Sequence, residues 1–413
     1  MNCVSRAGPS EVRQQRKTMI VRKLLRRNKI RCCTKTVELP HSQQPKSVQS
    51  FKAARPTDSK RCKCRMAVTD PATLHFLRHP NTHRSVSGVK VIETHMSWVF
   101  LAGQVAFKLK KPLCSDYLDF RSVDTRCRAC HEELRLNRRL APDVYLGVET
   151  ISQDADGRFR FGGGGKLVDC VVRMRRLPEH VMLSTQLVQG ALAPGVMEDV
   201  ATCIAQFHRS LPALRPAPAA WRKVISEAID SNAAALLSCS QCLPTSEVLS
   251  LCQLQRNFLL SHAAWIDARI HQGCMVEGHG DLRAEHVFIS DTVGAIDCLE
   301  FSALLRQLDR VDEIGFLALD CERLGGEAAA KALLQHYQVI ANDYPPPALL
   351  HFYQSLRAAV RARLAIVRVS EQSYRPSQAW VDRAKGWLQL AVKHASAMRL
   401  DQPCISSTMD PPS

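Results

Sequence analysis

The sequence predicts an α+β fold of two lobes, with a β-rich first lobe and a mainly helical second lobe. Three runs of alternating apolar residues, at 89–93, 97–101 and 105–110, lie close together and are typical of strands. From Met182 onward strand signals almost vanish and helical periodicity dominates, apart from a strand-loop-strand segment at 275–297. Two packed lobes favour a ligand site in the cleft between them.

Composition excludes several classes of protein. Hydrophobic residues make up 46% of the chain and charged residues 23%, as expected for a protein with a real core. No apolar run reaches about 18 residues, the length that spans a membrane, and the start lacks the apolar core of a secretory signal. We therefore expect a cytoplasmic protein with no membrane span.

The positive charge is concentrated at the start of the chain. The net charge is +17, and residues 1–65 account for +15 of it. This segment lacks clear periodicity, so residues 1–66 are expected to form a basic, disordered extension. It could bind nucleic acid or an anionic surface weakly. An upstream translation start, with Met19 or Met66 as the authentic one, is the alternative explanation.

The 17 cysteines are scattered rather than grouped. The pairs Cys127/Cys130 and Cys239/Cys242 are more than a hundred residues apart, which does not match the spacing of a zinc ribbon. The first pair lies in a helical pattern, where positions i and i+3 share a face. We therefore expect reduced, mostly buried thiols and no metal site made of cysteines.

The strongest motif is HGDLRAEH at 279–286, followed by IDCLEF at 296–301. Phosphoryl transfer from ATP requires a carboxylate that orients the acceptor hydroxyl, and ligands for the metal that neutralises phosphate charge. Asp281 in a turn, His286 five residues later and Asp297 after a short hairpin match these needs. A turn with local side-chain capping is the alternative for Asp281 alone, but the ordered set is a stronger signal.

This ordered set resembles the HxDxxxxN loop and the following IDxE-like segment of the aminoglycoside phosphotransferase-like family, which are small-molecule kinases related to protein kinases. The resemblance covers roughly residues 86–390 and implies a protein-kinase-like two-lobed fold. It implies Asp281 as catalytic base, Asp297 as the main metal ligand and His286 as a second ligand. It also implies ATP with Mg²⁺ or Mn²⁺, and a small hydroxylated molecule as acceptor.

An upstream segment agrees with this resemblance. The run VAFK is similar to the VAIK strand of kinases, where alternation puts Ala106 and Lys108 on the face towards the nucleotide. A carboxylate on the next helix, at 122–140, should hold Lys108. Glu132 and Glu133 are both available, and spacing to a later leucine favours Glu133. An edge strand with solvated lysines is the alternative.

Other nucleotide contacts are expected from two places. Thr94 and Ser97 belong to the first loop, which has no glycine-rich run, and Arg173 and Met174 lie where the resemblance puts the linker that contacts adenine. The run at 162–166 resembles a Walker loop only superficially, because a leucine follows the lysine where Ser or Thr is needed. We interpret that run as a flexible hairpin tip.

His286 stands where the family has asparagine. A neutral imidazole suits Mn²⁺ or Zn²⁺ better than Mg²⁺, so the substitution favours Mn²⁺, a metal held mainly by Asp297, or impaired activity.

Two alternatives to an active phosphotransferase stay open. One is a nucleotide-binding pseudokinase that acts as a regulatory or partner-binding module, and the other is a nucleic-acid-associated protein that uses residues 1–65.

Charged residues of two later helices are also singled out. Three arginines share one face of a late helix and either pair with Asp320 or Glu322 or line the acceptor pocket, which would favour a neutral or anionic acceptor; they are Arg357, Arg361 and Arg368. Three acids lie at the start of an earlier helix, where negative charge complements the helix dipole; they are Asp309, Asp312 and Glu313. His208 is expected to be a packed core histidine.

The expected domains combine these observations. The basic extension precedes a nucleotide-binding first lobe at 67–174, a helical second lobe with the catalytic loop at 175–400, and a disordered tail at 401–413.

Overall fold

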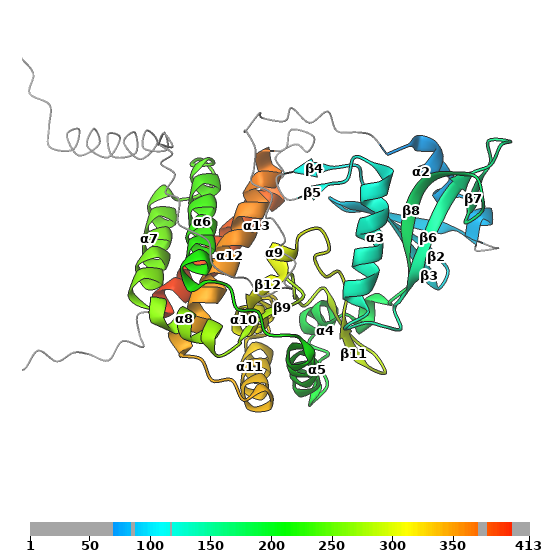
Figure 1. Ribbon diagram of the computed structural model, residues 1–413. Helices are drawn as coiled ribbons and strands as arrows, with labels where there is room; N and C mark the ends of the chain where they lie inside the picture. The colour runs from blue at the N-terminus through cyan, green and yellow to red at the C-terminus, as the bar shows by residue number, and fades with distance from the viewer. Residues whose placement is uncertain (1–68, 84–86, 116–117, 371–377, 399–413) are drawn as a thin grey trace, which may run out of the picture. The chain divides into compact units, whose positions relative to one another are not determined.

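The computed structural model describes residues 69–83, 87–115, 118–370 and 378–398, all within one compact unit at 63–413 (Figure 1). The expected basic extension and the C-terminal tail lie outside the described residues. Among the described residues, no helix is long and apolar enough to cross a membrane.

The first lobe is an antiparallel sheet of six strands in the order β1-β2-β3-β8-β6-β7. The strands are β1 (Val89–Glu93), β2 (Ser97–Ala102), β3 (Val105–Lys110), β6 (Tyr145–Gln153), β7 (Phe159–Phe161) and β8 (Lys166–Arg175). The other elements of this lobe are α2 (Pro71–Arg78), η1 (Pro80–His83), β4 (Cys114–Ser115), β5 (Leu118–Asp119) and α3 (Val123–Asn137).

Two helices cover opposite faces of this sheet. Alternation along β8 places Val171 in one apolar cluster with Leu77 of α2, and places Val172 in another cluster with Cys130 of α3. Figure 1 shows α3 running along the sheet on the side that faces the helical lobe. The sheet face that carries α3 is therefore the one that borders the site described below.

The second lobe is mainly helical. Its helices are η2 (Glu179–Val181), α4 (Leu183–Gln189), α5 (Val196–Ser210), α6 (Pro218–Leu237), α7 (Thr245–Ser261), α8 (Ala263–His271), α9 (Ala303–Arg306), α10 (Arg310–Arg323), α11 (Glu327–Ala341), α12 (Pro347–Ser370) and α13 (Gln378–Ala397). Its short strands are β9 (Met275–Glu277), β10 (Val287–Ile289), β11 (Val293–Ala295) and β12 (Gln307–Asp309). The predicted α+β class, strand-rich first and helix-rich second, is confirmed.

Helix α10 lies at the centre of this lobe. Every residue from Val311 to Cys321 is buried, and its apolar side chains belong to both large clusters of the helical lobe. The buried stretch includes three acids, Asp312, Glu313 and Asp320. Buried carboxylates require hydrogen-bonding partners, and α10 finds several of its partners in the loop between β9 and β10.

Three details of the sequence interpretation are wrong. Helical periodicity predicts one helix near 303–323 and one at 246–270. The first is interrupted by β12, which pairs with β9, and the second is two helices that meet at His262. The glycine run at 162–165 is not a hairpin tip, because it connects β7 to β8 across the intervening β6. A Cβ on Gly165 would lie 2.4 Å from the backbone oxygen of Gln153, so this close crossing requires glycine.

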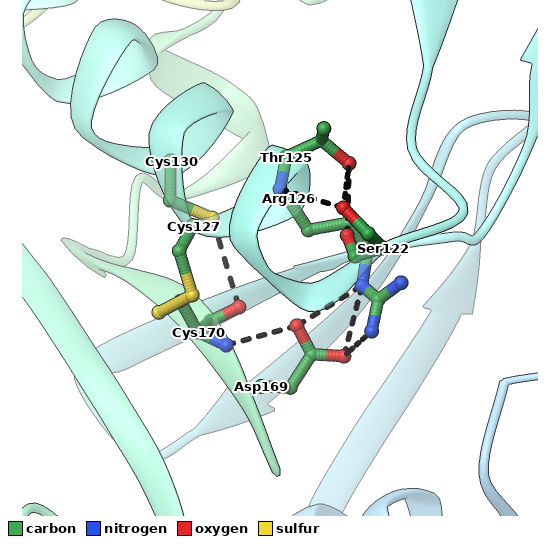
Figure 2. The surroundings of a disulfide bond; sticks show 7 residues. All are labelled: Ser122, Thr125, Arg126, Cys127, Cys130, Asp169 and Cys170. Carbon is green, nitrogen blue, oxygen red and sulfur yellow. Dashed lines mark hydrogen bonds and ion pairs between the residues drawn. A yellow bond between two sulfur atoms is a disulfide. The ribbon is translucent and has the colours of Figure 1, made fainter. Parts of the chain in front are cut away.

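The expectation that the thiols are reduced is also wrong for four cysteines. Cys127 of α3 is bonded to Cys170 of β8, and Cys239 is bonded to Cys242. Figure 2 shows the first disulfide beside the free thiol of Cys130, which lies 3.6 Å from the Cys170 carbonyl oxygen. The helical spacing of Cys127 and Cys130 did not indicate that Cys127 is bonded to Cys170, which lies 43 residues later on the sheet.

Candidate active site

Lys108 of β3 brings three segments of the chain together. Its Nζ donates a hydrogen bond to Glu133 Oε1 of α3 at 2.7 Å and another to Asp297 Oδ1 of the segment after β11. Burial disfavours the charged ammonium, but Asp297 and Glu133 outweigh this effect and raise the pKa of Lys108 well above its ordinary value. Glu132, the alternative partner, instead contacts Arg135 and Arg306.

A second lysine on the same face of β3 also binds Glu133. Lys110 Nζ lies 2.6 Å from Glu133 Oε2 and 2.5 Å from Glu300 Oε1, and only 1% of its side chain is exposed. Burial opposes its charge, but Glu133 and Glu300 outweigh burial and raise the pKa of Lys110 above its ordinary value. Our sequence interpretation missed Lys110 and Glu300, although two lysines spaced i, i+2 on a strand must share a face.

The loop between β9 and β10 carries Asp281 and is held by α10. Glu313 accepts hydrogen bonds from the backbone N–H of His279 at 2.9 Å and of Gly280 at 2.7 Å. It also lies 2.9 Å from Nε2 of His208. Burial disfavours the charge on Glu313, but these hydrogen bonds and nearby imidazoles outweigh burial and lower its pKa to about 2.

Two further acids of α10 hold the same loop. Asp320 Oδ2 accepts the backbone N–H of Ala284 at 3.0 Å. Asp312 binds Arg357 of α12 at 2.6 Å, and Arg357 donates in turn to the Gly280 carbonyl oxygen at 3.2 Å. For Asp312 and Glu313, the predicted role of complementing the helix dipole therefore leaves out their contacts with this loop. The buried position of His208 agrees with the expected packed histidine.

Asp281 lies beside two arginines and a histidine and is partly exposed. Its Oδ2 is 3.1 Å from Arg283 Nη2 and 3.8 Å from His286 Nδ1, and its Oδ1 is 3.9 Å from Arg361 Nη1. Burial opposes ionisation, but these groups outweigh burial and lower the pKa of Asp281 to about 2. The carboxylate is therefore ionised at neutral pH. About 20% of the side chain is exposed, so it can be reached by a hydroxyl group.

His286 lies between Asp281 and Asp297. Its Nδ1 donates to the backbone oxygen of Asp281 at 2.8 Å, which leaves Nε2 as the nitrogen with a free lone pair. This Nε2 accepts a hydrogen bond from Arg283 at 3.2 Å and lies 3.7 Å from Asp297 Oδ2. A metal ion on Nε2 would have to replace the contact with Arg283.

Asp297 combines an open carboxylate with an unusual backbone. Its φ is +65°, a left-handed conformation that costs energy in a non-glycine residue and is common at functional sites. The Asp297 N–H donates to the Tyr145 hydroxyl at 3.1 Å, and the next N–H, of Cys298, donates to Asn137 of α3 at 2.9 Å. About 47% of the Asp297 side chain is exposed, so its second oxygen is open to a ligand.

The residues expected to bind nucleotide differ in their placement. Ala106 and Met174 are paired across β3 and β8 on the face of Lys108, whereas Arg173 pairs with Phe107 and its side chain lies on the opposite face. In the β1–β2 turn, the Thr94 hydroxyl accepts the Ser97 N–H at 3.0 Å. The hydrogen-bonding groups of Thr94 and Ser97 thus close the turn itself.

The arginines of α12 do not form the ion pairs that we considered. Asp320 binds Arg323, and Glu322 binds Lys393 and His394. Arg368 contacts His95 of the β1–β2 turn. Of the two alternatives for the three arginines, pairing with Asp320 or Glu322 is therefore wrong.

Comparison with known proteins gives relatives in sequence and in backbone arrangement. No protein-family model matches the chain. Uncharacterized proteins of Mycobacterium tuberculosis and Mycobacterium bovis are each 34% identical over 296 residues, which is 71% of this chain and 57% of the relative. The chain thus spans little more than half the length of these relatives.

Several solved structures are similar to this chain. A choline/ethanolamine kinase family protein of Mesorhizobium loti has a TM-score of 0.45 at 14% identity, covering 80% of this chain and 98% of that protein. A choline kinase of Cryptosporidium parvum has a TM-score of 0.46 at 8% identity, covering 75% and 89%. An aminoglycoside phosphotransferase of Streptomyces rimosus, solved with ADP and streptomycin, has a TM-score of 0.40 at 14% identity, covering 69% and 96%. These three solved proteins are kinases or phosphotransferases.

Proposed function

We propose that this chain is an ATP-dependent phosphotransferase that moves the γ-phosphate of ATP to a hydroxyl group of a small molecule. The observation that carries the proposal is the contact of Lys108 with both Glu133 and Asp297. One ammonium joins the strand, the helix and the segment after the hairpin, and His286 connects Asp297 to Asp281. This is the set of groups that phosphoryl transfer requires.

The proposed roles follow from charge and position. Lys108, held by Glu133, would bind phosphate oxygens of the nucleotide, with Ala106 and the backbone of Arg173 and Met174 near the adenine, and Thr94 and Ser97 shaping the loop above the phosphates. Asp281 would accept a hydrogen bond from the acceptor hydroxyl. The oxygen of the acceptor hydroxyl then forms a bond to the γ-phosphorus. At the same time the bond between the γ-phosphorus and the β–γ bridging oxygen breaks, and ADP leaves with the electron pair. The hydroxyl proton passes to Asp281.

The low pKa of Asp281 refines its role. A carboxylate with a pKa of about 2 is a weak base, so it would take the proton late, after most of the new P–O bond has formed. Its main contribution is then orientation of the hydroxyl group. Arg283, His286 and Arg361 together lower this pKa against the effect of burial.

The acidic groups fit a divalent cation held largely by the nucleotide. No group of three or more His, Cys, Asp or Glu side chains that could hold a metal ion occurs among the described residues. Mg²⁺ is commonly bound by one or two carboxylates together with substrate phosphates, and Asp297 offers one open carboxylate. The cation, Mg²⁺ or Mn²⁺, would supply charge neutralisation at the phosphates. His286 is a candidate second ligand if Arg283 moves away from Nε2.

A pseudokinase is the second candidate, and a specific observation favours it. Arg283 occupies the lone pair of His286 Nε2, at the position where the resembling family has a metal-binding asparagine. If that contact persists with nucleotide bound, the chain would bind nucleotide without efficient turnover. It would then act through partners instead.

One experiment separates the two functions. ADP formation would be measured with ATP and either Mg²⁺ or Mn²⁺ across sugars, amino alcohols and aminoglycosides, and ADP binding would be measured by calorimetry. Turnover that depends on one acceptor class and is lost in Asp281→Asn supports the phosphotransferase. ADP binding without acceptor-dependent turnover supports the pseudokinase, and absence of both contradicts the two proposals together.

A further inference from the structure

Arg361 of α12 is the least satisfied charged group near Asp281. Its Nε is buried and has no hydrogen-bond partner among the described residues. The guanidinium forms an ion pair with Asp281, in which Nη1 lies 3.9 Å from Oδ1. This distance exceeds the length of a hydrogen bond. The guanidinium lies over the ring of Trp387 at 5.9 Å, and about 21% of the side chain is exposed.

The neighbouring charges are already neutralised. Arg283 lies 2.5 Å from Glu285 Oε1 and 3.1 Å from Asp281 Oδ2, and Arg357 binds Asp312 through two nitrogens. Burial and the positive charge of Arg283 both lower the pKa of Arg361. The carboxylates of Asp281, Glu285 and Asp320 act in the opposite direction, but burial and Arg283 outweigh them.

An unsatisfied buried donor is rare in native proteins and calls for a physical reason. The planar guanidinium presents several N–H groups in the geometry that suits a carboxylate. A substrate carboxylate on Arg361 would lie within a few ångströms of a hydroxyl bound by Asp281, because the two side chains are 3.9 Å apart. Arg283 would offset the repulsion between that carboxylate and Asp281.

We propose that Arg361 is the anion-binding residue of the acceptor site, and that the acceptor is a hydroxylated carboxylic acid such as a sugar acid. This inference rests on the proposed phosphotransferase function, because it assigns the acceptor of that reaction. A polycationic acceptor would meet an unpaired arginine at the same place and be repelled. Glu285 cannot reverse this preference, because its carboxylate is already paired with Arg283.

The first test needs no acceptor. Arg361→Met keeps an unbranched side chain of similar helix propensity while removing the charged guanidinium. If Arg361 is kept for a ligand, the ligand-free variant should unfold at the same temperature as the wild type or higher. Arg256→Met is the control, since Arg256 makes an exposed ion pair with Asp230 on another face. A clear fall in melting temperature, beyond that of the control, would make Arg361 structural and overturn the proposal.

The second test uses matched probes that differ in one group. D-gluconate, D-glucitol and D-glucamine share a six-carbon chain with a terminal carboxylate, hydroxyl or ammonium, and glycerate, glycerol and 3-amino-1,2-propanediol form a shorter set. In calorimetry with ADP bound, the carboxylate should bind tightest in at least one set. Arg361→Met should weaken that binding about tenfold, the effect of one charge-assisted hydrogen bond, while leaving the neutral member unchanged.

The outcomes separate this inference from the proposed function. Tighter binding of the neutral or cationic members, no binding by either set, or a carboxylate preference that survives in Arg361→Met would overturn the anion site. Transfer of phosphate to a neutral or cationic acceptor would do so while leaving the phosphotransferase intact. Arg361-dependent carboxylate binding without phosphate transfer would support the anion site and count against the phosphotransferase.

Discussion

Lys110 of β3 and Glu133 of α3 are joined by a buried ion pair, with 2.6 Å between Nζ and Oε2. The other Glu133 oxygen binds Lys108, so one carboxylate holds both lysines. Since Lys110 also binds Glu300, three residues after Asp297, the strand, the helix and the hairpin segment are locked together. The orientation of Lys108 therefore depends on Lys110 and Glu300 as well as on its own partners.

Replacing Lys110 with Met should destabilise the protein strongly. The change leaves Glu133 and Glu300 as buried carboxylates with one partner fewer, and loss of one member of a buried pair costs about 3–5 kcal/mol. Urea denaturation of Lys110→Met would measure it, with Lys90→Met on the exposed side of β1 as the control. Equal stability of the two variants would contradict a tight buried network.

Lys108→Ala should weaken ATP binding, because the ammonium is expected to hold the phosphates. Glu133→Gln should give a milder loss, since Lys108 and Lys110 then lose a charged partner. Glu132→Gln is the matched control on the same helix, and its partners are Arg135 and Arg306. Nucleotide titration by calorimetry would rank the three variants, and a larger loss in Glu132→Gln would refute the assignment.

Asp281→Asn should lower kcat by about 10²-fold or more, in line with the contribution of a positioned acid–base group. Nucleotide affinity should change little, because Asp281 is expected to face the acceptor. Steady-state kinetics and ADP titration would be compared for the same preparation. Turnover close to that of the wild type would remove Asp281 from the proposed mechanism.

Mn²⁺ should support at least as much activity as Mg²⁺, because an imidazole nitrogen suits Mn²⁺ better. His286→Asn should shift the preference towards Mg²⁺. Rates would be measured at matched free concentrations of the two ions. If the metal profile does not change, His286 is not a metal ligand and its Nε2 stays with Arg283.

Glu313 should contribute to stability in a defined range of pH. The fold lowers its pKa from 4.5 to about 2, so its contribution is present above pH 4.5 and is lost as the pH falls towards 2. Wild type should therefore lose more stability than Glu313→Gln between these values. Denaturation measured from pH 5 to pH 2.5 would compare the slopes, and parallel curves would exclude this contribution.

The sequence predicted what local patterns encode. Alternation located β1 to β3, and short motifs located Lys108, Glu133, Asp281 and Asp297, which the structure joins directly or through His286. The roles of these four residues stay predictions. Local patterns could not show that a helix is interrupted by β12, because the reason is its pairing with the distant β9.

The sequence interpretation mainly missed ion pairs and a disulfide between residues that lie far apart in the chain. Glu300 lies 190 residues from Lys110, and Glu313 lies 105 residues from His208, so no spacing rule relates them. Arg361 was one of three arginines on a predicted face, and only the fold distinguishes it from Arg357. The disulfide between Cys127 and Cys170 was missed for the same reason.

The three acids of α10 determine how the loop that carries Asp281 moves. The backbone N–H groups of His279, Gly280 and Ala284 donate hydrogen bonds to Glu313 and Asp320. Both acids belong to α10, which is buried along most of its length. Loops usually open locally and at low free-energy cost, but this loop can open only by exposing carboxylates of the core. Opening of this loop is therefore expected to be slow and costly compared with that of loops held only by surface contacts.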